Sequence, residues 1–303
     1  MSDPFVPPQQ GQPLISVIMP VYNDTHRLGL CLDLLAKQTI ADQAEVIVVD
    51  NGSTEDMSAV KARFPTVQWL HEAKPGSYAA RNTGIAVARG RILAFTDSDC
   101  LPSAVWLEKG IAPLLGDNPP SFVGGAIDLV TTGASRLSAA EIFDLAVGFP
   151  QKRFVEVVHF AMTANMLTRA ETMAEVGLFS TAMKSGGDRD WGNRAWAKVG
   201  PGLYVDEARI GHPTRSTPPE VLKRVRRVAG GERDRHPGWA DCLKFCVRHV
   251  TPPRRAILDI AAIDPQVAGT GTKLGAMLFA YRTRFSLIRY RLALQFGGES
   301  QRS

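Results

Sequence analysis

Long apolar runs are absent from this sequence of 303 residues. No stretch approaches the roughly 18 consecutive apolar residues that a membrane-spanning helix needs, so we expect none. Residues 1–13 also lack the apolar segment of a signal peptide. They are rich in proline and glutamine, which predicts a flexible N-terminal tail.

Cysteine is scarce, with four residues at positions 31, 100, 242 and 246. Their spacing matches no disulfide framework, and Cys242 and Cys246 stand four apart rather than in a C-x-x-C pair. We therefore expect four free thiols in a reducing compartment. This predicts a cytoplasmic protein, with the inner face of the cell membrane as an alternative location.

Charge is unevenly distributed along the chain. Residues 1–215 carry 19 Lys and Arg against 23 Asp and Glu, whereas residues 216–303 carry 16 against 7. The basic C-terminal part indicates an anionic partner, which can be a membrane surface, an acidic acceptor or a nucleic acid. Nucleic acid is the least favoured, because aromatic residues are not interleaved there to form a stacking platform.

The N-terminal half alternates short apolar, β-branched runs with amphipathic segments, which is typical of a mostly parallel α/β sheet. The expected strands are residues 14–19, 45–49, 67–70 and 91–96, and the expected helices are residues 26–38, 58–64 and 77–88. Further along we expect strands at 122–130 and 155–169, and helices at 139–147, 173–176, 188–198, 220–229 and 274–294.

Polar residues follow three of these strands, and this placement locates a site. Tyr22-Asn23, Asp50 and Asp97-Ser98-Asp99 each come directly after a predicted strand. Open α/β sheets bind ligands at the carboxyl ends of their strands, so we expect the three segments to meet at one edge.

The two carboxylates of Asp97-Ser98-Asp99 point to a cation. Carboxylates crowded at a strand end repel each other unless a cation joins them. Hard oxygen ligands suit Mg²⁺ or Mn²⁺, usually shared with phosphate oxygens of a substrate. His212, after a possible strand ending near residue 210, is a candidate further ligand, although a lone histidine is more often structural.

Other candidates have both a functional and a structural interpretation. Asp50 can bind a base or ribose or simply form an Asx turn, and Tyr22 can offer a ring to a base or only pack. Arg81, one turn into a helix after a glycine loop, can pair with phosphate or with a carboxylate. Asp188 can act as a general base or serve as the N-cap of its helix.

Five motifs in order resemble the family 2 glycosyltransferases of the GT-A fold. They are PVYN at 20–23, VVDNGS at 48–53, KPGSYAARN at 74–82, FTDSD at 95–99 and GGDRDW at 186–191. Residues 216–303 lie outside the resemblance, and helical patterning there predicts a basic, mainly helical extension. Over residues 14–215 the resemblance implies a Rossmann-like three-layer α/β/α domain with a mostly parallel sheet. It further implies an inverting transfer of sugar from a nucleoside diphosphate sugar, with a UDP sugar favoured, to a glycan or lipid-linked acceptor.

The resemblance also assigns roles to individual residues. Asp188 would be the catalytic base, Asp99 and His212 the ligands of Mn²⁺ or Mg²⁺, and the nucleotide sugar would contact Pro20, Tyr22, Asn23, Asp50, Arg81, Asp97 and Ser98. Thr163-Ala164-Asn165 resembles the segment before the acceptor site. The chain departs from the family at Asn51, where Asp is common, and at Gly187, where a Glu-Asp pair usually begins. The second departure leaves Asp190 as a competitor for the role of base.

Two alternatives to a glycosyltransferase follow from the same residues. A nucleotidyltransferase would normally carry a glycine-rich loop after its first strand, where this chain has PVYNDTHR. An inactive nucleotide-sugar-binding or membrane-assembly protein is disfavoured because Asp99 and Asp188 are both present. The basic C-terminal region predicts either a helical subdomain packed on the core or a peripheral membrane attachment.

Overall fold

The computed structural model describes residues 12–131, 133, 136–183 and 185–298. The tail predicted for residues 1–13 therefore lies almost wholly outside the described residues. The described residues divide into two compact units. The first contains residues 12–128, 150–181 and 187–212, and the second contains residues 129–149, 182–186 and 213–298.

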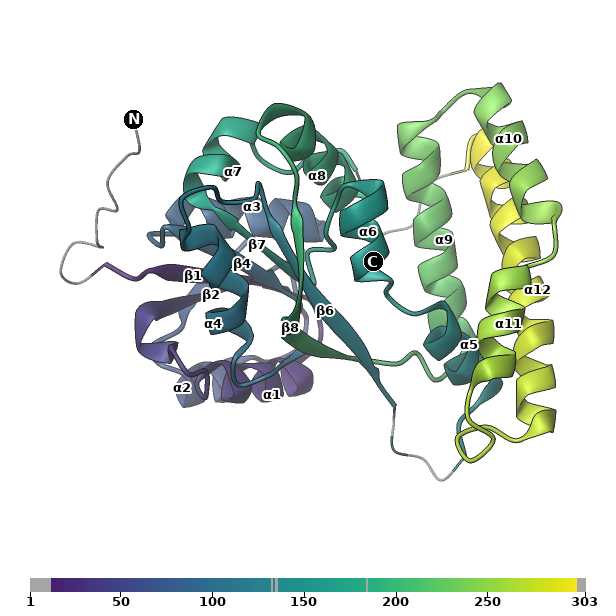
Figure 1. Ribbon diagram of the computed structural model, residues 1–303, viewed down its shortest axis with the longest axis horizontal. Helices are drawn as coiled ribbons and strands as arrows, with labels where there is room; N and C mark the ends of the chain where they lie inside the picture. Colours follow the sequence, from purple (N-terminus) through teal and green to yellow (C-terminus); the bar gives the residue numbers. More distant parts are fainter. Residues whose placement is uncertain (1–11, 132, 134–135, 184, 299–303) are drawn as a thin grey trace. The chain divides into compact units, whose positions relative to one another are not determined.

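A mixed sheet in the order β3-β2-β1-β4-β7-β6-β8-β5 forms the centre of the first unit (Figure 1). Its strands are β1 (Ile15–Val21), β2 (Ala44–Asp50), β3 (Gln68–His71), β4 (Ile92–Thr96), β5 (Leu101–Pro102), β6 (Val123–Val130), β7 (Asn165–Arg169) and β8 (Leu203–Pro213). Strands β1 to β4 are mutually parallel, whereas β7 runs antiparallel to both β4 and β6. The α/β fold class is confirmed.

Helices cover both faces of this sheet, with α1 and α2 on one side and α3, α7 and α8 on the other (Figure 1). The helices of the first unit are α1 (Thr25–Leu35), α2 (Ser58–Arg63), α3 (Ser77–Val87), α4 (Trp106–Ile111), α6 (Gln151–Val158), α7 (Ala170–Val176) and α8 (Gly187–Lys198). Two short 3₁₀ turns cover Ala41–Gln43 and Ala112–Leu115. The right-handed crossovers of parallel strands dictate this layering, because the strand order reverses between β3 and β4.

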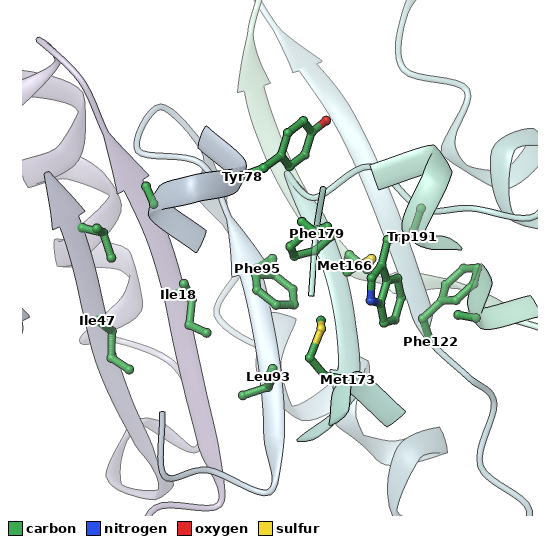
Figure 2. Packing of buried hydrophobic residues seen from close by; sticks show 14 of the residues in the cluster. Ile18, Ile47, Tyr78, Leu93, Phe95, Phe122, Met166, Met173, Phe179 and Trp191 are labelled. Carbon is green, nitrogen blue, oxygen red and sulfur yellow. The ribbon is translucent and has the colours of Figure 1, made fainter. Parts of the chain in front are cut away.

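Aromatic side chains fill the core between the sheet and α8. Phe95 of β4 meets the ring of Phe179 edge-on at 5.5 Å, and Phe179 lies 5.9 Å from Trp191 of α8 (Figure 2). The core is therefore continuous from the parallel strands to the helix that carries Asp188, which fixes that helix relative to the strand ends.

The strand predicted for residues 155–169 is partly wrong. Residues 151–158 form helix α6, and β7 begins only at Asn165. The burial of Gln151 and Val155, four residues apart, follows the helical period. The Gln151 side chain holds the helix to β7 by donating to the backbone oxygen of Asn165 at 2.9 Å.

The second unit is helical and includes the predicted basic extension. Its helices are α5 (Ala139–Val147), α9 (Pro218–Arg235), α10 (Trp239–Val250), α11 (Arg254–Ala262) and α12 (Thr270–Gln295). Phe143 of α5 and Phe279 of α12 meet edge-on at 5.5 Å in its apolar core. Among the described residues, no helix has the length and apolar character to cross a membrane.

A buried ion-pair cluster centred on Asp144 joins α5 to the segment that follows β8. The fully buried carboxylate of Asp144 accepts from Arg224 Nη1 at 2.9 Å and from the backbone nitrogen of Arg215 at 2.9 Å. Burial, and then the nearby charge of Arg215, lower the pKa of Arg224 to about 10. Two arginines thus pair with one buried carboxylate.

We expect Asp144→Ala to lower the free energy of unfolding by about 3–5 kcal/mol, because it leaves buried arginine charge uncompensated. Urea denaturation followed by circular dichroism measures the loss. Asp128→Ala is the matched control, since Asp128 pairs with Arg209 on the exposed surface, where such a pair contributes about 0–1 kcal/mol. Equal, small losses in the two variants would contradict the prediction.

Candidate active site

The predicted meeting of three polar segments at one sheet edge is confirmed. Strands β1, β2 and β4 run parallel, and Val21 at the end of β1 pairs in register with Asp50 at the end of β2. Asp97 follows Thr96, the last residue of β4. The segments after these strands therefore begin at the same edge, where ligands of open α/β sheets bind.

Asn23 joins the loop after β1 to the loop after β2 through hydrogen bonds. Its side-chain oxygen accepts from the backbone nitrogen of Thr54 at 2.8 Å, and its own backbone nitrogen donates to Ser53 Oγ at 2.9 Å. Pro20 is buried inside β1, whereas 54% of Tyr22 is exposed. Of these three predicted nucleotide contacts, Tyr22 thus presents its side chain to solvent, and Asn23 shapes the loops.

Asp50 caps the turn after β2 through a hydrogen bond three residues along the chain, rather than the two-residue Asx turn that the sequence allowed. Its Oδ1 accepts from the backbone nitrogen of Ser53 at 2.9 Å, and Oδ2 lies 3.6 Å from Nδ1 of His71. The carboxylate remains partly exposed at the edge. The turn therefore orients Asp50 without burying it.

Asn51 explains one departure from the family pattern. Its amide nitrogen donates to the backbone oxygens of Glu72 and Lys74 at 3.0 and 2.9 Å, and its oxygen accepts from the nitrogen of Gly76 at 2.6 Å. An aspartate could not donate to the two carbonyls. Asn51 therefore holds the loop that leads into α3.

Arg81 is buried and forms an ion pair with Asp97. The sequence allowed Arg81 to pair with a phosphate or with a carboxylate, and the structure shows the carboxylate pair. Its Nε has no hydrogen-bond partner within the described part of the chain, and its guanidinium lies 5.9 Å from the ring centre of Tyr78. Because the Asp97 side chain is 35% exposed, the pair presents a fixed carboxylate at the edge.

Asp99 and His212 lie side by side, although His212 is inside β8 rather than after it. The antiparallel pairing of Leu101 with Gly211 extends β8 past residue 210 and brings His212 Nε2 to 3.8 Å from Asp99 Oδ2. The prediction that a strand ends near residue 210 is therefore wrong, because this ladder continues the strand to Pro213. Arg27 Nη1 stands 3.9 Å from the same oxygen.

The electrostatics at Asp99 favour a cation. Burial and, to a smaller extent, the charge of Asp97 raise the pKa of the Asp99 carboxyl, while His212 and Arg27 oppose the rise. Among the described residues, no group of three or more His, Cys, Asp and Glu side chains is arranged to hold a metal. Asp99 and His212 by themselves supply one carboxylate and one imidazole, two donor types that divalent ions accept.

Three buried side chains pack in and around the Asp97-Ser98-Asp99 segment. Ser98 is buried, Cys31 Sγ contacts the backbone oxygen of Asp97 at 3.8 Å, and Cys100 Sγ contacts the oxygen of Ala164 at 3.9 Å. Burial raises the pKa of both thiols, with smaller contributions from the two aspartates. These cysteines are therefore packing residues, and the expectation that all four cysteines are free thiols is confirmed.

Asp188 lies in the first turn of α8 and is not its N-cap. The helix begins at Gly187, and Oδ1 of Asp188 accepts from the backbone nitrogen of Arg189 at 2.8 Å and from Tyr78 Oη at 3.3 Å. Tyr78 was missed by sequence reasoning, as was Arg27 near Asp99. The competitor Asp190 accepts from Arg194 Nε at 3.1 Å within the helix.

Asn165, in the segment predicted to precede the acceptor site, is buried in the sheet. Its oxygen accepts from Trp106 Nε1 at 2.8 Å, and its nitrogen donates to the backbone oxygens of Ala126 and Ala208 at 2.8 Å each. A β-carbon on Gly125 would lie 2.0 Å from that oxygen of Ala208. Asn165 thus joins β7 to the neighbouring strands.

Comparison with known proteins gives consistent matches. Residues 16–176 match the family model described as Glycosyl transferase family 2. Glycosyltransferase AglE of Haloferax volcanii is 36% identical over 227 residues, which cover 73% of each chain. A second relative is UDP-Glc:alpha-D-GlcNAc-diphosphoundecaprenol beta-1,3-glucosyltransferase WfgD of Escherichia coli. It is 32% identical over 129 residues, which cover 40% of this chain and 48% of that protein.

Two solved structures share the fold. A mannosyltransferase from Pyrobaculum calidifontis, in complex with GDP-Man and Mn²⁺, has a TM-score of 0.63 at 16% identity, covering 94% of this chain and 88% of that one. TarS of S. aureus, residues 1–349, has a TM-score of 0.54 at 16% identity, covering 95% and 93%. These similarities confirm the GT-A type fold with C-terminal helices.

Proposed function

Because the chain belongs to glycosyl transferase family 2 and is a glycosyltransferase, we propose that it moves a sugar from a nucleoside diphosphate sugar to a hydroxyl acceptor with inversion at the anomeric carbon. Asp188 is the proposed general base, and Asp99 with His212 the proposed metal ligands. Family membership disfavours both the nucleotidyltransferase and the inactive binding protein considered above.

A continuous series of contacts between Asp188 and the strand edge carries this proposal. Asp188 accepts from Tyr78, the ring of Tyr78 lies 5.9 Å from the guanidinium of Arg81, and Arg81 pairs with Asp97. The proposed base and the proposed donor site thus share one set of packed side chains. A base must come within hydrogen-bond reach of the acceptor oxygen, and these contacts support an Asp188 that lies beside the proposed donor site.

In the proposed reaction, the acceptor oxygen forms a bond to the anomeric carbon while the bond from that carbon to the diphosphate breaks. Asp188 accepts the hydroxyl proton, and the nucleoside diphosphate leaves with the electron pair. In-line attack on the face opposite the diphosphate inverts the anomeric centre. Tyr22 and Asp50 flank the nucleoside at the ends of β1 and β2.

Asp99 and His212 would hold Mn²⁺ or Mg²⁺, which when bound supplies positive charge next to the departing diphosphate. Arg81 holds Asp97 in a fixed position beside them. Arg27, 3.9 Å from Asp99, adds a further positive charge on the same side. These side chains therefore favour a negatively charged leaving group at this edge.

The relatives indicate the substrate class for the proposal. The name of the Escherichia coli relative specifies a UDP-glucose donor and a diphosphoundecaprenol-linked acceptor, whereas the Pyrobaculum structure contains GDP-Man. We propose a UDP sugar as donor and a lipid-linked glycan as acceptor. Transfer and donor-hydrolysis assays across UDP and GDP sugars, with Mn²⁺, Mg²⁺ or EDTA, test this. Absence of turnover with every nucleotide sugar would overturn the enzymatic proposal.

For a lipid-linked acceptor, we also propose peripheral contact with the inner face of the cell membrane through the second unit. Helices α10 and α12 pack together, and each carries exposed apolar residues at helical spacing. These residues are Trp239, Leu243, Val247 and Val250 on α10, and Leu274, Leu278, Tyr281 and Phe285 on α12. Exposed Lys244 and Arg255 in the same unit each pair with an aspartate, but residues 216–303 as a whole carry 16 Lys and Arg against 7 Asp and Glu. This combination suits an interface with anionic lipid.

We expect Leu243→Ser/Phe285→Ser to lower the partition coefficient for anionic vesicles by about a hundredfold or more, because each lost apolar side chain removes roughly 1.5–3 kcal/mol of interfacial burial. Flotation with vesicles that contain phosphatidylglycerol measures it, and neutral vesicles test the basic contribution. Leu203→Ser is the control, because Leu203 is an exposed apolar residue at the start of β8 in the first unit. Equal recovery of wild type and double variant would contradict membrane contact.

A further inference from the structure

The departure at position 187 has a structural counterpart in Tyr78. A β-carbon added to Gly187 would lie 2.8 Å from Cε2 of Tyr78 and 3.0 Å from two further ring atoms. The 2.8 Å separation is shorter than real β-carbon contacts and the other two are tighter than most, so any larger residue at position 187 requires the ring to move. The ring of Tyr78 therefore occupies the space next to the backbone where the family usually carries glutamate.

The same side chain reaches the neighbouring aspartate. The Tyr78 hydroxyl donates to Oδ1 of Asp188 at 3.3 Å, and the backbone nitrogen of Arg189 donates to that same oxygen at 2.8 Å. Tyr78 and Asp188 are 110 residues apart in the chain and belong to different helices, α3 and α8. One oxygen of the carboxylate is thus held from two directions.

The ring of Tyr78 is itself immobilised. It is buried and packs against Phe179, with ring centres 5.8 Å apart, and Arg81 lies 5.9 Å from its centre. Figure 2 shows the hydroxyl pointing away from the labelled core side chains. A tyrosine with a buried ring and a hydroxyl at the edge of the core is suited to holding a polar partner in one orientation.

From these contacts we propose that Tyr78 is the positioning residue for Asp188, and that Gly187 is small because the Tyr78 ring needs its space. The inference rests on the proposed role of Asp188 as base. Fixing Oδ1 restricts rotation of the carboxylate, so that the acceptor hydroxyl meets an oxygen in a defined direction. Tyr78 acts through Asp188 and exchanges no proton with the acceptor.

The test is Tyr78→Phe, which keeps the ring and removes the hydroxyl. We expect kcat for transfer to fall by about tenfold, because a single hydrogen bond to a charged group orients the base. The KM for the nucleotide sugar and the melting temperature should stay unchanged. Tyr204→Phe is the matched control, since its hydroxyl donates to Asp206 at 2.8 Å on the exposed side of β8; it should leave kcat unchanged.

A second pair of variants tests the role of Gly187. Gly187→Ala alone should lower kcat, whereas in the Tyr78→Ala background the added methyl group should have no further effect, because the ring is gone. Additive losses, or unchanged kcat in Tyr78→Phe, would overturn the inference. If Asp188→Asn retains full activity, the proposed function fails instead; if Asp188→Asn is inactive while Tyr78→Phe is fully active, only the positioning role fails.

Discussion

Replacing Asp188 by asparagine is expected to lower kcat for sugar transfer by about 10²- to 10⁴-fold, the usual contribution of a general base. The amide keeps the size of the carboxylate and its acceptor oxygen for Tyr78 and Arg189, but it cannot take the acceptor proton. Affinity for the nucleotide sugar should remain unchanged, because the nucleotide is proposed to bind at the strand ends. Initial rates at saturating donor, together with calorimetric titration of the donor, separate the two effects.

Asp190→Asn is the matched control for this prediction. It makes the same chemical change two residues further along α8, at a carboxylate that pairs with Arg194 in the helix. Loss of such a partly exposed pair costs about 0.3–0.5 kcal/mol of stability, so kcat should be nearly unchanged. Full activity in Asp188→Asn would contradict the proposed role of Asp188 as base, and inactivity confined to Asp190→Asn would transfer that role to Asp190. Weakened donor binding in Asp188→Asn would likewise count against its assignment as base.

The local parts of the site were predictable because strand ends are visible in the sequence. Residues 15–21 and 92–96 are buried throughout, and each run stops where polar residues begin. Parallel strands then bring those ends to one edge whatever the loops between them do. This is why the positions of Asp50 and Asp99 could be placed before the structure was known.

Contacts between distant segments could not be predicted in the same way. Residues 155–169 suggested a strand, but packing of Val155 and the Gln151 contacts to Met162 and Asn165 accompany a helix over 151–158. Asn165 looked like a polar residue before a binding site, yet three long-range hydrogen bonds bury it in the sheet. Local patterns do not record such partners, so tertiary contacts overrode them.

The proximity of Tyr78 to Asp188 was hidden for a related reason. In the sequence, Tyr78 is one residue in a helix, and Gly187 is simply a missing glutamate. Only the fold shows that the ring fills the space above the glycine and that its hydroxyl meets the next residue. A departure from a family pattern at one position was thus matched at another position 109 residues away.

Asp99→Ala is expected to weaken donor binding in the presence of Mn²⁺ by about 100-fold or more, because it removes the proposed anionic ligand of a cation worth several kcal/mol to the diphosphate. In EDTA, wild type and variant should bind the donor equally weakly. Calorimetric titration of the nucleoside diphosphate with and without Mn²⁺ measures the difference. Undiminished Mn²⁺-dependent binding in the variant would contradict the ligand assignment.

The melting temperature of Asp99→Ala distinguishes a loss of Mn²⁺-dependent donor binding from unfolding of the variant. Burial raises the pKa of Asp99 in the folded protein, so its ionised form is less favourable there than in the unfolded chain. For an acid with a raised pKa, the stabilising contribution is present below the ordinary pKa of the carboxyl and is lost as the pH rises through its raised pKa in the folded protein. At neutral pH without metal, Asp99→Ala should therefore melt no lower than wild type. A variant that melts normally yet no longer responds to Mn²⁺ has lost a ligand rather than its fold.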